Sequence, residues 1–277
     1  MQVAVLSGKG GTGKTLLSVN LSYLANNSVY VDCDVEEPNG LLYYQLENTN
    51  VEELSRKIPS IDHDKCIGCK KCTEFCKFNA LAYIMGKVQV FEELCHSCGG
   101  CKLVCPVDAI EEKDKSIGRI KSGMYEDTMV YSGELNIGEQ SGVTIISGLL
   151  KKVKNSTKEV FVDSPPGNGC SVMESIGDAD YCLLVAEPSI FGLHNLNMVY
   201  NLAKVFEKKI GLVINKATDN DLIRDFAKEN DIKIVGEIPM DLELGRLNSN
   251  GEIVAKVKKY ETIFRSILKN IHKELVS

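Results

Sequence analysis

The 277-residue chain predicts an α/β fold, a doubly wound, mostly parallel sheet interrupted by a small α+β module. Short apolar segments alternate with segments of helical apolar spacing from the N-terminus to the C-terminus, as in strand–helix–strand crossovers. Between them, eight of the eleven cysteines lie within residues 66–105. The odd number of cysteines disfavours an extracellular disulfide framework, and an intracellular chain with many thiols more often binds metal.

The composition excludes several classes of protein. The chain has 32 Lys and Arg against 38 Asp and Glu, a net charge of −6, so it has no built-in attraction for nucleic acid or anionic lipid. No apolar run approaches the ~20 residues that span a bilayer, and the N-terminus lacks the pattern of a secretory signal. We therefore expect a cytoplasmic protein with no nucleic-acid partner and no stable membrane association.

The first expected strand, Gln2–Ser7, leads into the glycine-rich loop GKGGTGKT at residues 8–15, which fits the P-loop pattern G-x4-G-K-T. A helix is expected over Thr15–Ala25, so strand, loop and helix follow in the required order. Glycines let backbone N–H groups turn toward phosphate oxygens, and the helix N-terminus favours the same charge. Lys14 is expected to reach the β- and γ-phosphates, and Thr15 to bind Mg²⁺. The predicted nucleotide-contacting residues of this motif are Gly8, Gly10, Gly11, Thr12, Gly13, Lys14, Thr15 and Leu16.

Two further apolar segments end in acids, as an open α/β site requires. The strand Val29–Val31 delivers Asp32 and Asp34, and the strand before Asp163 ends in that acid. A turn with two solvated acids is the alternative for Asp32 and Asp34. The other expected elements are strands at Tyr181–Val185, Gly211–Lys216 and Ile234–Ile238 and helices at Leu193–Phe206, Leu222–Glu229 and Thr262–Leu275.

The last helix carries its apolar residues on one face, with Lys and Arg opposite. Such a helix fits core packing, and membrane binding is the alternative. Cys33 and Cys182 fall in strand patterns and are expected to be buried thiols.

The clustered cysteines form two copies of the spacing C-x2-C-x2-C-x3-C, the run that binds [4Fe–4S] clusters. In that arrangement three close cysteines hold one cluster and the fourth ligates the other. The first predicted cluster is held by Cys66, Cys69, Cys72 and Cys105, and the second by Cys95, Cys98, Cys101 and Cys76. A pair of structural zinc sites is the alternative. We expect the module to span residues 58–117, inside a domain made of residues 1–57 and 118–277.

The loop sequence K-G-G-T-G-K-T at residues 9–15 resembles the deviant Walker A motif of the MinD/ParA/Mrp and nitrogenase iron protein ATPases. The resemblance implies that Lys9 and Lys14 are both catalytic. Lys9 is expected to cross the interface of an ATP-dependent homodimer and contact the nucleotide of the other subunit. It also implies that Asp34 orients the attacking water and that Asp163 is the Walker B acid, which helps to hold Mg²⁺. Asp32 is then expected to touch Mg²⁺ through water.

Two more segments resemble the same family. Ser164-Pro165-Pro166-Gly167 after Asp163 is similar to its D-x-P-P-G switch, which implies that Gly167 offers its N–H to the γ-phosphate. The resemblance further implies that Asn215 reads adenine and that the Pro239 loop flanks the ring. Cys170 lies seven residues after Asp163, the offset of a bridging cluster ligand in the nitrogenase iron protein. It is therefore a speculative bridging ligand or redox thiol, with an ordinary buried or loop thiol as the alternative.

The cysteine segment resembles a bacterial two-cluster ferredoxin, with Lys77 where proline usually follows the fourth cysteine. The whole chain thus resembles MinD-like ATPases that contain an inserted ferredoxin domain. This implies ATP, Mg²⁺ and two [4Fe–4S] clusters as cofactors, with ATP hydrolysis coupling a dimer switch to electron transfer toward a redox acceptor. The alternative is an ATPase scaffold or carrier that serves an apo-metalloprotein in metal-cofactor assembly. A partition switch without redox chemistry would not need eight cluster cysteines.

Overall fold

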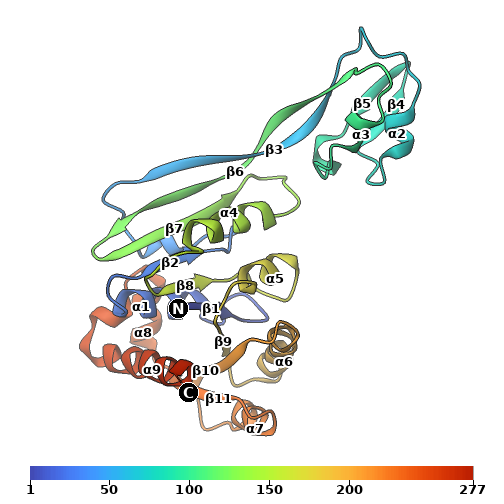
Figure 1. Cartoon of the computed structure of the whole chain (residues 1–277). Helices are drawn as coiled ribbons and strands as arrows, with labels where there is room; N and C mark the ends of the chain where they lie inside the picture. The colour runs from blue at the N-terminus through green and yellow to red at the C-terminus, as the bar shows by residue number, and fades with distance from the viewer. Residues whose placement is uncertain (277) are drawn as a thin grey trace. The chain divides into compact units, whose positions relative to one another are not determined.

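The computed structural model describes residues 1–276, which fold into two compact units (Figure 1). The first unit comprises Met1–Val51, Ile120–Glu134 and the chain from Ser141 onward, and the second comprises Glu52–Arg119 and Leu135–Gln140. The second unit therefore begins before residue 58, ends after residue 117, and adds a short segment well beyond the predicted module.

Over these residues, nine strands form one sheet in the order β11-β10-β9-β1-β8-β2-β7-β6-β3. From β11 to β7 in this order, each strand pairs in parallel with its neighbour. The predicted α/β fold class is therefore confirmed. The strands of this parallel part are β1 Gln2–Leu6, β2 Val29–Asp32, β7 Thr128–Leu135, β8 Val160–Asp163, β9 Tyr181–Ala186, β10 Lys209–Ala217 and β11 Lys233–Pro239. Four of these strands, β1, β2, β8 and β9, are buried at every residue, so they read as apolar runs without alternation.

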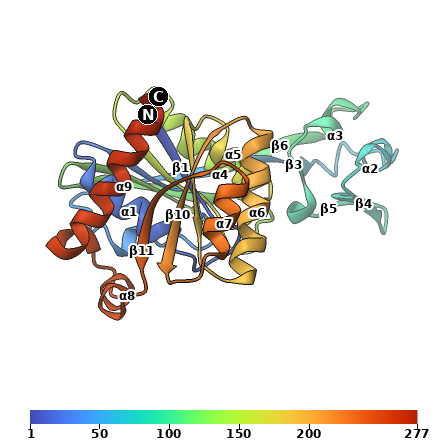
Figure 2. The same ribbon diagram turned by 90° about the horizontal axis from the view of Figure 1, so that it is seen from below.

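Helices cover both faces of the sheet in the first unit (Figure 2). One face carries α1 Lys14–Leu24, α8 Leu242–Ser249 and α9 Lys258–Val276. The other face carries α4 Val143–Val153, α5 Cys170–Ile176, α6 Ile190–Val205 and α7 Leu222–Glu229. Parallel strands with crossover helices on both sides bring the carboxyl ends of β1, β2 and β8 to one edge, where ligands bind in such folds.

Two long strands at the sheet edge have no counterpart in the sequence predictions. β3, Asn50–Ile61, and β6, Ile110–Tyr125, lie side by side (Figure 1), and β6 continues through a two-residue turn into β7. Most of their residues are exposed or half-buried, and β6 is rich in Lys, Glu, Ser and Gly. Such strands lack the apolar runs from which β1, β2, β8, β9, β10 and β11 were predicted, and the half-buried β7 was not predicted either.

The second unit is small and contains short elements. Its α2 spans Lys71–Phe75, its α3 spans Gly100–Leu103, and the antiparallel hairpin consists of β4, Leu81–Ile84, and β5, Lys87–Val90. Its buried core is formed by Leu81, Val88, Ile110, Cys72 and Cys101. A core of this size includes two cysteine thiols, which fits a module that depends on metal for stability.

The apolar face of α9 packs into the core of the first unit. Tyr260, Phe264 and Ile271 are fully buried, and Ile267 and Leu268 are nearly so. The prediction of core packing for this helix is confirmed, as is the burial of Cys33 and Cys182. Over residues 1–276, no helix combines the length and hydropathy needed to cross a membrane.

We predict that Phe264→Ala lowers the free energy of unfolding by about 3–5 kcal/mol, because it removes a fully buried aromatic ring. Urea unfolding followed by circular dichroism would measure the change. The exposed Lys269 on the same helix supplies the control, since Lys269→Ala should change stability by less than about 0.5 kcal/mol. A similar small loss for Phe264→Ala would contradict the packing of this helix face.

Candidate nucleotide and cluster sites

The glycine-rich loop after β1 has the backbone that phosphate binding requires. Gly11 and Gly13 adopt positive φ angles of 73° and 104°, which side chains with a Cβ rarely adopt. At Gly13 a Cβ would also overlap the side-chain amide of Asn215. The carbonyl of Lys9 is fixed by the hydroxyls of Ser7, at 2.7 Å, and Thr12, at 3.1 Å. The loop ends at the N-terminus of α1, where Gly13 provides no side-chain cap, so the first N–H groups of the helix are open to an anion.

Asn215 on β10 holds the loop from the other side. Its Nδ2 donates to the carbonyl of Thr12 over 2.8 Å, and its Oδ1 accepts from the backbone N–H of Lys216 over 3.0 Å. The side chain is buried. Pro239, exposed at the end of β11, lies one residue beyond the register partner of Asn215. Contact of either residue with a base stays a prediction. Leu16 is buried in the core, so only its backbone can face a nucleotide.

Two buried carboxylates lie at the ends of adjacent strands. Asp32 on β2 and Asp163 on β8 are register partners, and both are almost completely inaccessible. Asp32 accepts N–H groups from Asp34, at 3.2 Å, and Gly40, at 2.9 Å. Asp163 Oδ2 accepts from the Tyr30 hydroxyl at 3.0 Å, whereas its Oδ1 is buried without a hydrogen-bond partner within residues 1–276.

Burial makes the ionised forms of the Asp32, Asp34 and Asp163 carboxyl groups unfavourable, and a bound cation would stabilise them. Burial raises the pKa of Asp32 well above its usual range, and the neighbouring Asp163 adds to the effect. Burial also raises the pKa of Asp163, with buried Lys14 opposing it. Burial raises the pKa of Asp34 to about 6, again against the charge of Lys14. A hard divalent cation binds carboxylate and hydroxyl oxygens, so the unpartnered oxygen of Asp163 beside Thr15 fits Mg²⁺.

Lys9 is engaged within its own chain. Its Nζ lies 3.4 Å from Glu187 Oε2, and Lys216 Nζ lies 2.7 Å from Glu187 Oε1. Although burial opposes it, these two lysines lower the pKa of Glu187. The N–H of Gly167 likewise donates to the carbonyl of Ser7 over 2.9 Å. In this structure the Lys9 ammonium and the Gly167 N–H are therefore both engaged within the chain, and their predicted contacts with nucleotide stay predictions. Glu187 was not identified from the sequence as a site residue. Its position directly after the apolar strand β9 is the pattern that could have indicated it.

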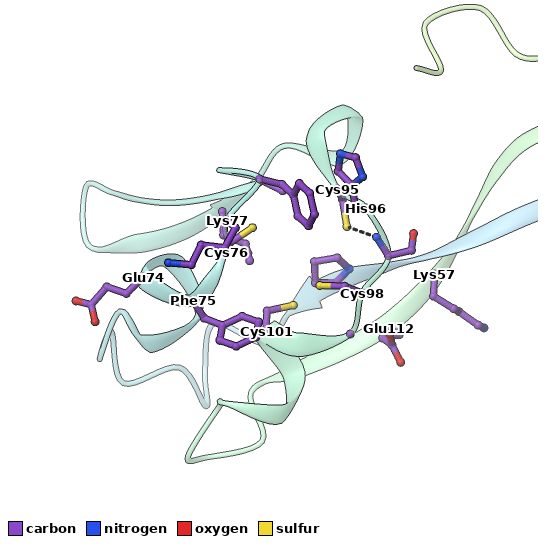
Figure 3. Close-up of a pocket in the computed structure, with 16 residues that line it drawn as sticks. Lys57, Glu74, Phe75, Cys76, Lys77, Cys95, His96, Cys98, Cys101 and Glu112 are labelled. Carbon is purple, nitrogen blue, oxygen red and sulfur yellow. Dashed lines mark hydrogen bonds between the residues drawn. The ribbon is translucent and has the colours of Figure 1, made fainter. Parts of the chain in front are cut away.

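The eight clustered cysteines divide between two pockets. One pocket of about 660 Å³ is lined by Cys76, Cys95, Cys98 and Cys101, whose sulfur atoms face one shared space (Figure 3). A much smaller pocket is lined by Cys66, Cys69, Cys72 and Cys105. These are the two crossed sets that the ferredoxin spacing predicts, with the fourth cysteine of each run beside the other run.

Backbone N–H groups and burial shape the surroundings of three of these thiols. Cys95 Sγ accepts the N–H of Ser97 at 3.4 Å, and Cys105 Sγ accepts that of Ala109 at 3.3 Å. Burial raises the pKa of Cys101 to about 11, so this thiol would ionise only when metal binds it. No group of three or more His, Cys, Asp or Glu within residues 1–276 lies close enough to hold a single metal ion. Four thiols around one cavity fit a cluster, whose irons bind one thiolate each.

Cys170 lies outside both cysteine sets, whereas His96 lines the larger cysteine pocket. Cys170 is exposed at the start of α5 and lines a groove with α4 residues, including Ser147 and Lys151. His96 stacks on Phe78 with ring centroids 3.9 Å apart, which is a packing contact beside the larger cysteine pocket.

Known proteins resemble this chain along most of its length. A family model described as the CobQ/CobB/MinD/ParA nucleotide binding domain matches residues 3–254. An uncharacterized protein of Methanocaldococcus jannaschii is 32% identical over 255 residues, 90% of this chain and 88% of that protein. The cell division ATPase MinD of Pyrococcus furiosus superimposes with a TM-score of 0.60 over 98% of both chains, at 19% identity, a likeness of fold alone. A shorter match, 37% identical over 54 residues, relates 18% of this chain to 70% of an uncharacterized ferredoxin of M. jannaschii.

We predict that Asp34→Asn changes how stability depends on pH. The pKa of Asp34 is about 6 in the folded chain and about 3.9 in an unfolded one, so the folded state binds the proton more tightly. Wild-type stability should therefore fall as the pH rises from about 4 to 6, and this contribution is missing in the variant. Urea unfolding of nucleotide-free protein between about pH 4 and 7 would measure the difference between the two proteins. A difference that does not vary with pH would contradict the prediction.

Proposed function

Because the chain belongs to the CobQ/CobB/MinD/ParA nucleotide-binding family, we propose that it is an ATP-hydrolysing dimer switch that drives electron transfer through two [4Fe–4S] clusters to an acceptor protein. The observation that carries the proposal is the division of eight cysteines into two four-thiol pockets on a chain with a P-loop. A cytoplasmic location is part of the proposal.

The nucleotide half of the proposal rests on the groups around the P-loop. Lys14 and the N–H groups at the start of α1 would bind the phosphates of ATP, and Thr15 with Asp163 would hold Mg²⁺. Asp34 would accept a hydrogen bond from the attacking water, a task that requires its ionised form. Lys9 would exchange Glu187 for the nucleotide of a second subunit, which would make dimer closure depend on ATP.

The cluster half rests on the thiols. When bound, [4Fe–4S] clusters supply one-electron transfer at low potential. The cysteines would fix each cluster by four thiolates, leaving no coordination site open for release. Complete ligand sets favour a stable electron relay over delivery of these clusters to another protein. The short match to a ferredoxin supports the same assignment.

One observation favours the second candidate, an ATPase that delivers or assembles a metal cofactor. Cys170 is the one exposed cysteine outside the two sets within residues 1–276, and it lies seven residues after Asp163. A shared thiol at that position could bind a third metal site between two subunits.

We predict that Lys14→Ala abolishes nucleotide binding and that Lys9→Ala retains it but weakens ATP-dependent dimerisation at least tenfold. Lys14 lies buried beside the phosphate site, whereas Lys9 is tied to Glu187 until a second subunit offers its nucleotide. Calorimetry with MgATP would measure binding, and sedimentation with and without MgATP would measure dimerisation. Lys216→Ala is the matched control, because it removes the other lysine on Glu187 without altering the P-loop. Normal dimerisation of Lys9→Ala would contradict the deviant Walker A assignment.

We predict about eight irons per chain in anaerobically purified protein, a loss of iron in Cys98→Ser, and unchanged iron in Cys170→Ser. After reduction, MgATP and an acceptor should remove reducing equivalents while the iron stays bound. Electron paramagnetic resonance and iron analysis of the separated proteins would follow both quantities. Transfer of iron to an apo-acceptor, or loss of iron in Cys170→Ser, would instead support cofactor delivery. Zinc in place of iron would overturn both.

A further inference from the structure

Arg56, on β3, fixes the loop that carries the second run of cysteines. Its guanidinium Nη1 donates to the carbonyl of Cys95, and its Nη2 donates to the carbonyl of Glu92 over 2.9 Å. Glu92 begins the single 3₁₀ turn Glu92–Leu94 that precedes Cys95. The arginine side chain is only 16% exposed, so its charge is poorly screened by water.

Glu139 balances this charge. Its carboxylate lies 3.1 Å from Arg56 Nη2 and 2.9 Å from Lys115 Nζ, and its side chain is 8% exposed. Arg56 lies on β3 and Lys115 lies on β6, whereas Glu139 lies in the irregular segment that follows β7. Arg56 Nε is buried without a hydrogen-bond partner within residues 1–276. The Glu139 carboxylate therefore compensates the positive charges of both Arg56 and Lys115.

The network is specific to one of the two thiol sets. The pocket of Cys76, Cys95, Cys98 and Cys101 is also lined by the charged residues Lys57, Glu74, Lys77 and Glu112, which cancel in sum. The smaller pocket has a single charged lining residue, Lys70, and no comparable arginine among the described residues around it. A change in the Arg56–Glu139 pair should therefore act on one cluster far more than on the other.

We propose that Arg56 and Glu139 form a charge pair that sets the reduction potential of the cluster bound by Cys76, Cys95, Cys98 and Cys101. The inference rests on the proposed function, because it requires the bound clusters. Reduction adds one electron, and hence one negative charge, so a nearby cation favours the reduced state and a nearby anion opposes it. Arg56 is thus a positioning residue for the Cys95 loop and a source of positive potential, which Glu139 attenuates.

The pair predicts opposite effects for two charge-removing variants. Arg56→Gln should lower the reduced-to-oxidised ratio of this cluster roughly tenfold at fixed potential, a shift of ~59 mV for one electron. Glu139→Gln should raise the ratio by a similar factor, because it leaves Arg56 and Lys115 unbalanced. Arg56→Lys keeps the charge and should stay within about threefold of wild type.

Redox titrations of the intact protein, monitored by electron paramagnetic resonance, would measure the midpoints of both clusters. The cluster of Cys66, Cys69, Cys72 and Cys105 is the internal reference, and its midpoint should stay constant in all variants. Glu134→Gln is the matched control, since Glu134 pairs with Lys121 on β6 in the first unit.

The outcomes separate this inference from the proposed function. Wild-type protein without iron–sulfur signals would overturn the proposed function and this inference with it. Clusters with unchanged midpoints in Glu139→Gln, or equal shifts of both clusters, would overturn the inference alone. If Arg56→Gln loses iron, the upward shift in Glu139→Gln decides the matter, because that variant leaves both contacts of Arg56 to the cysteine loop intact.

Discussion

The nucleotide site depends on one electrostatic constraint, the burial of Asp32 and Asp163 side by side. Parallel pairing of β2 with β8 places the two carboxylates in register, where neither can reach bulk water. Burial and mutual repulsion favour their protonated forms, and buried Lys14 opposes this effect at Asp163. A cation that bound between the two carboxylates would favour their ionised forms and would thereby stabilise the first unit.

In the second unit the constraint is the small size of the apolar core. This unit is too small to bury a large apolar core, and two of its core residues are cysteines. The two core cysteines are Cys72 and Cys101, and burial raises the pKa of both thiols. In both units, buried groups that could serve as metal ligands reduce stability, and a bound metal would offset that cost.

Sequence reasoning succeeded wherever the chemistry lies close along the chain. The P-loop and the cysteine runs are local patterns, and the strands that end in Asp32 and Asp163 are apolar enough to be recognised. It missed groups whose partners are distant in sequence, such as Glu187 beside Lys9 and Glu139 beside Arg56. It also missed β3, β6 and β7, because these partly exposed strands contain no continuous apolar run. Cys170 could be located but not interpreted, since the role of a thiol depends on what approaches it.

The second unit is built from two separate segments of the chain, which limits where the protein can be cut into domains. The chain passes between the two units after residues 51, 119, 134 and 140, so the smaller unit includes a hexapeptide that lies beyond the main insertion. Excision of residues 58–117 would leave Arg56 and Glu139 behind without the loop that Arg56 contacts. The second unit therefore cannot be removed or grafted intact at residues 58 and 117. A functional chimera would have to exchange both segments together, and related chains should vary in both segments jointly.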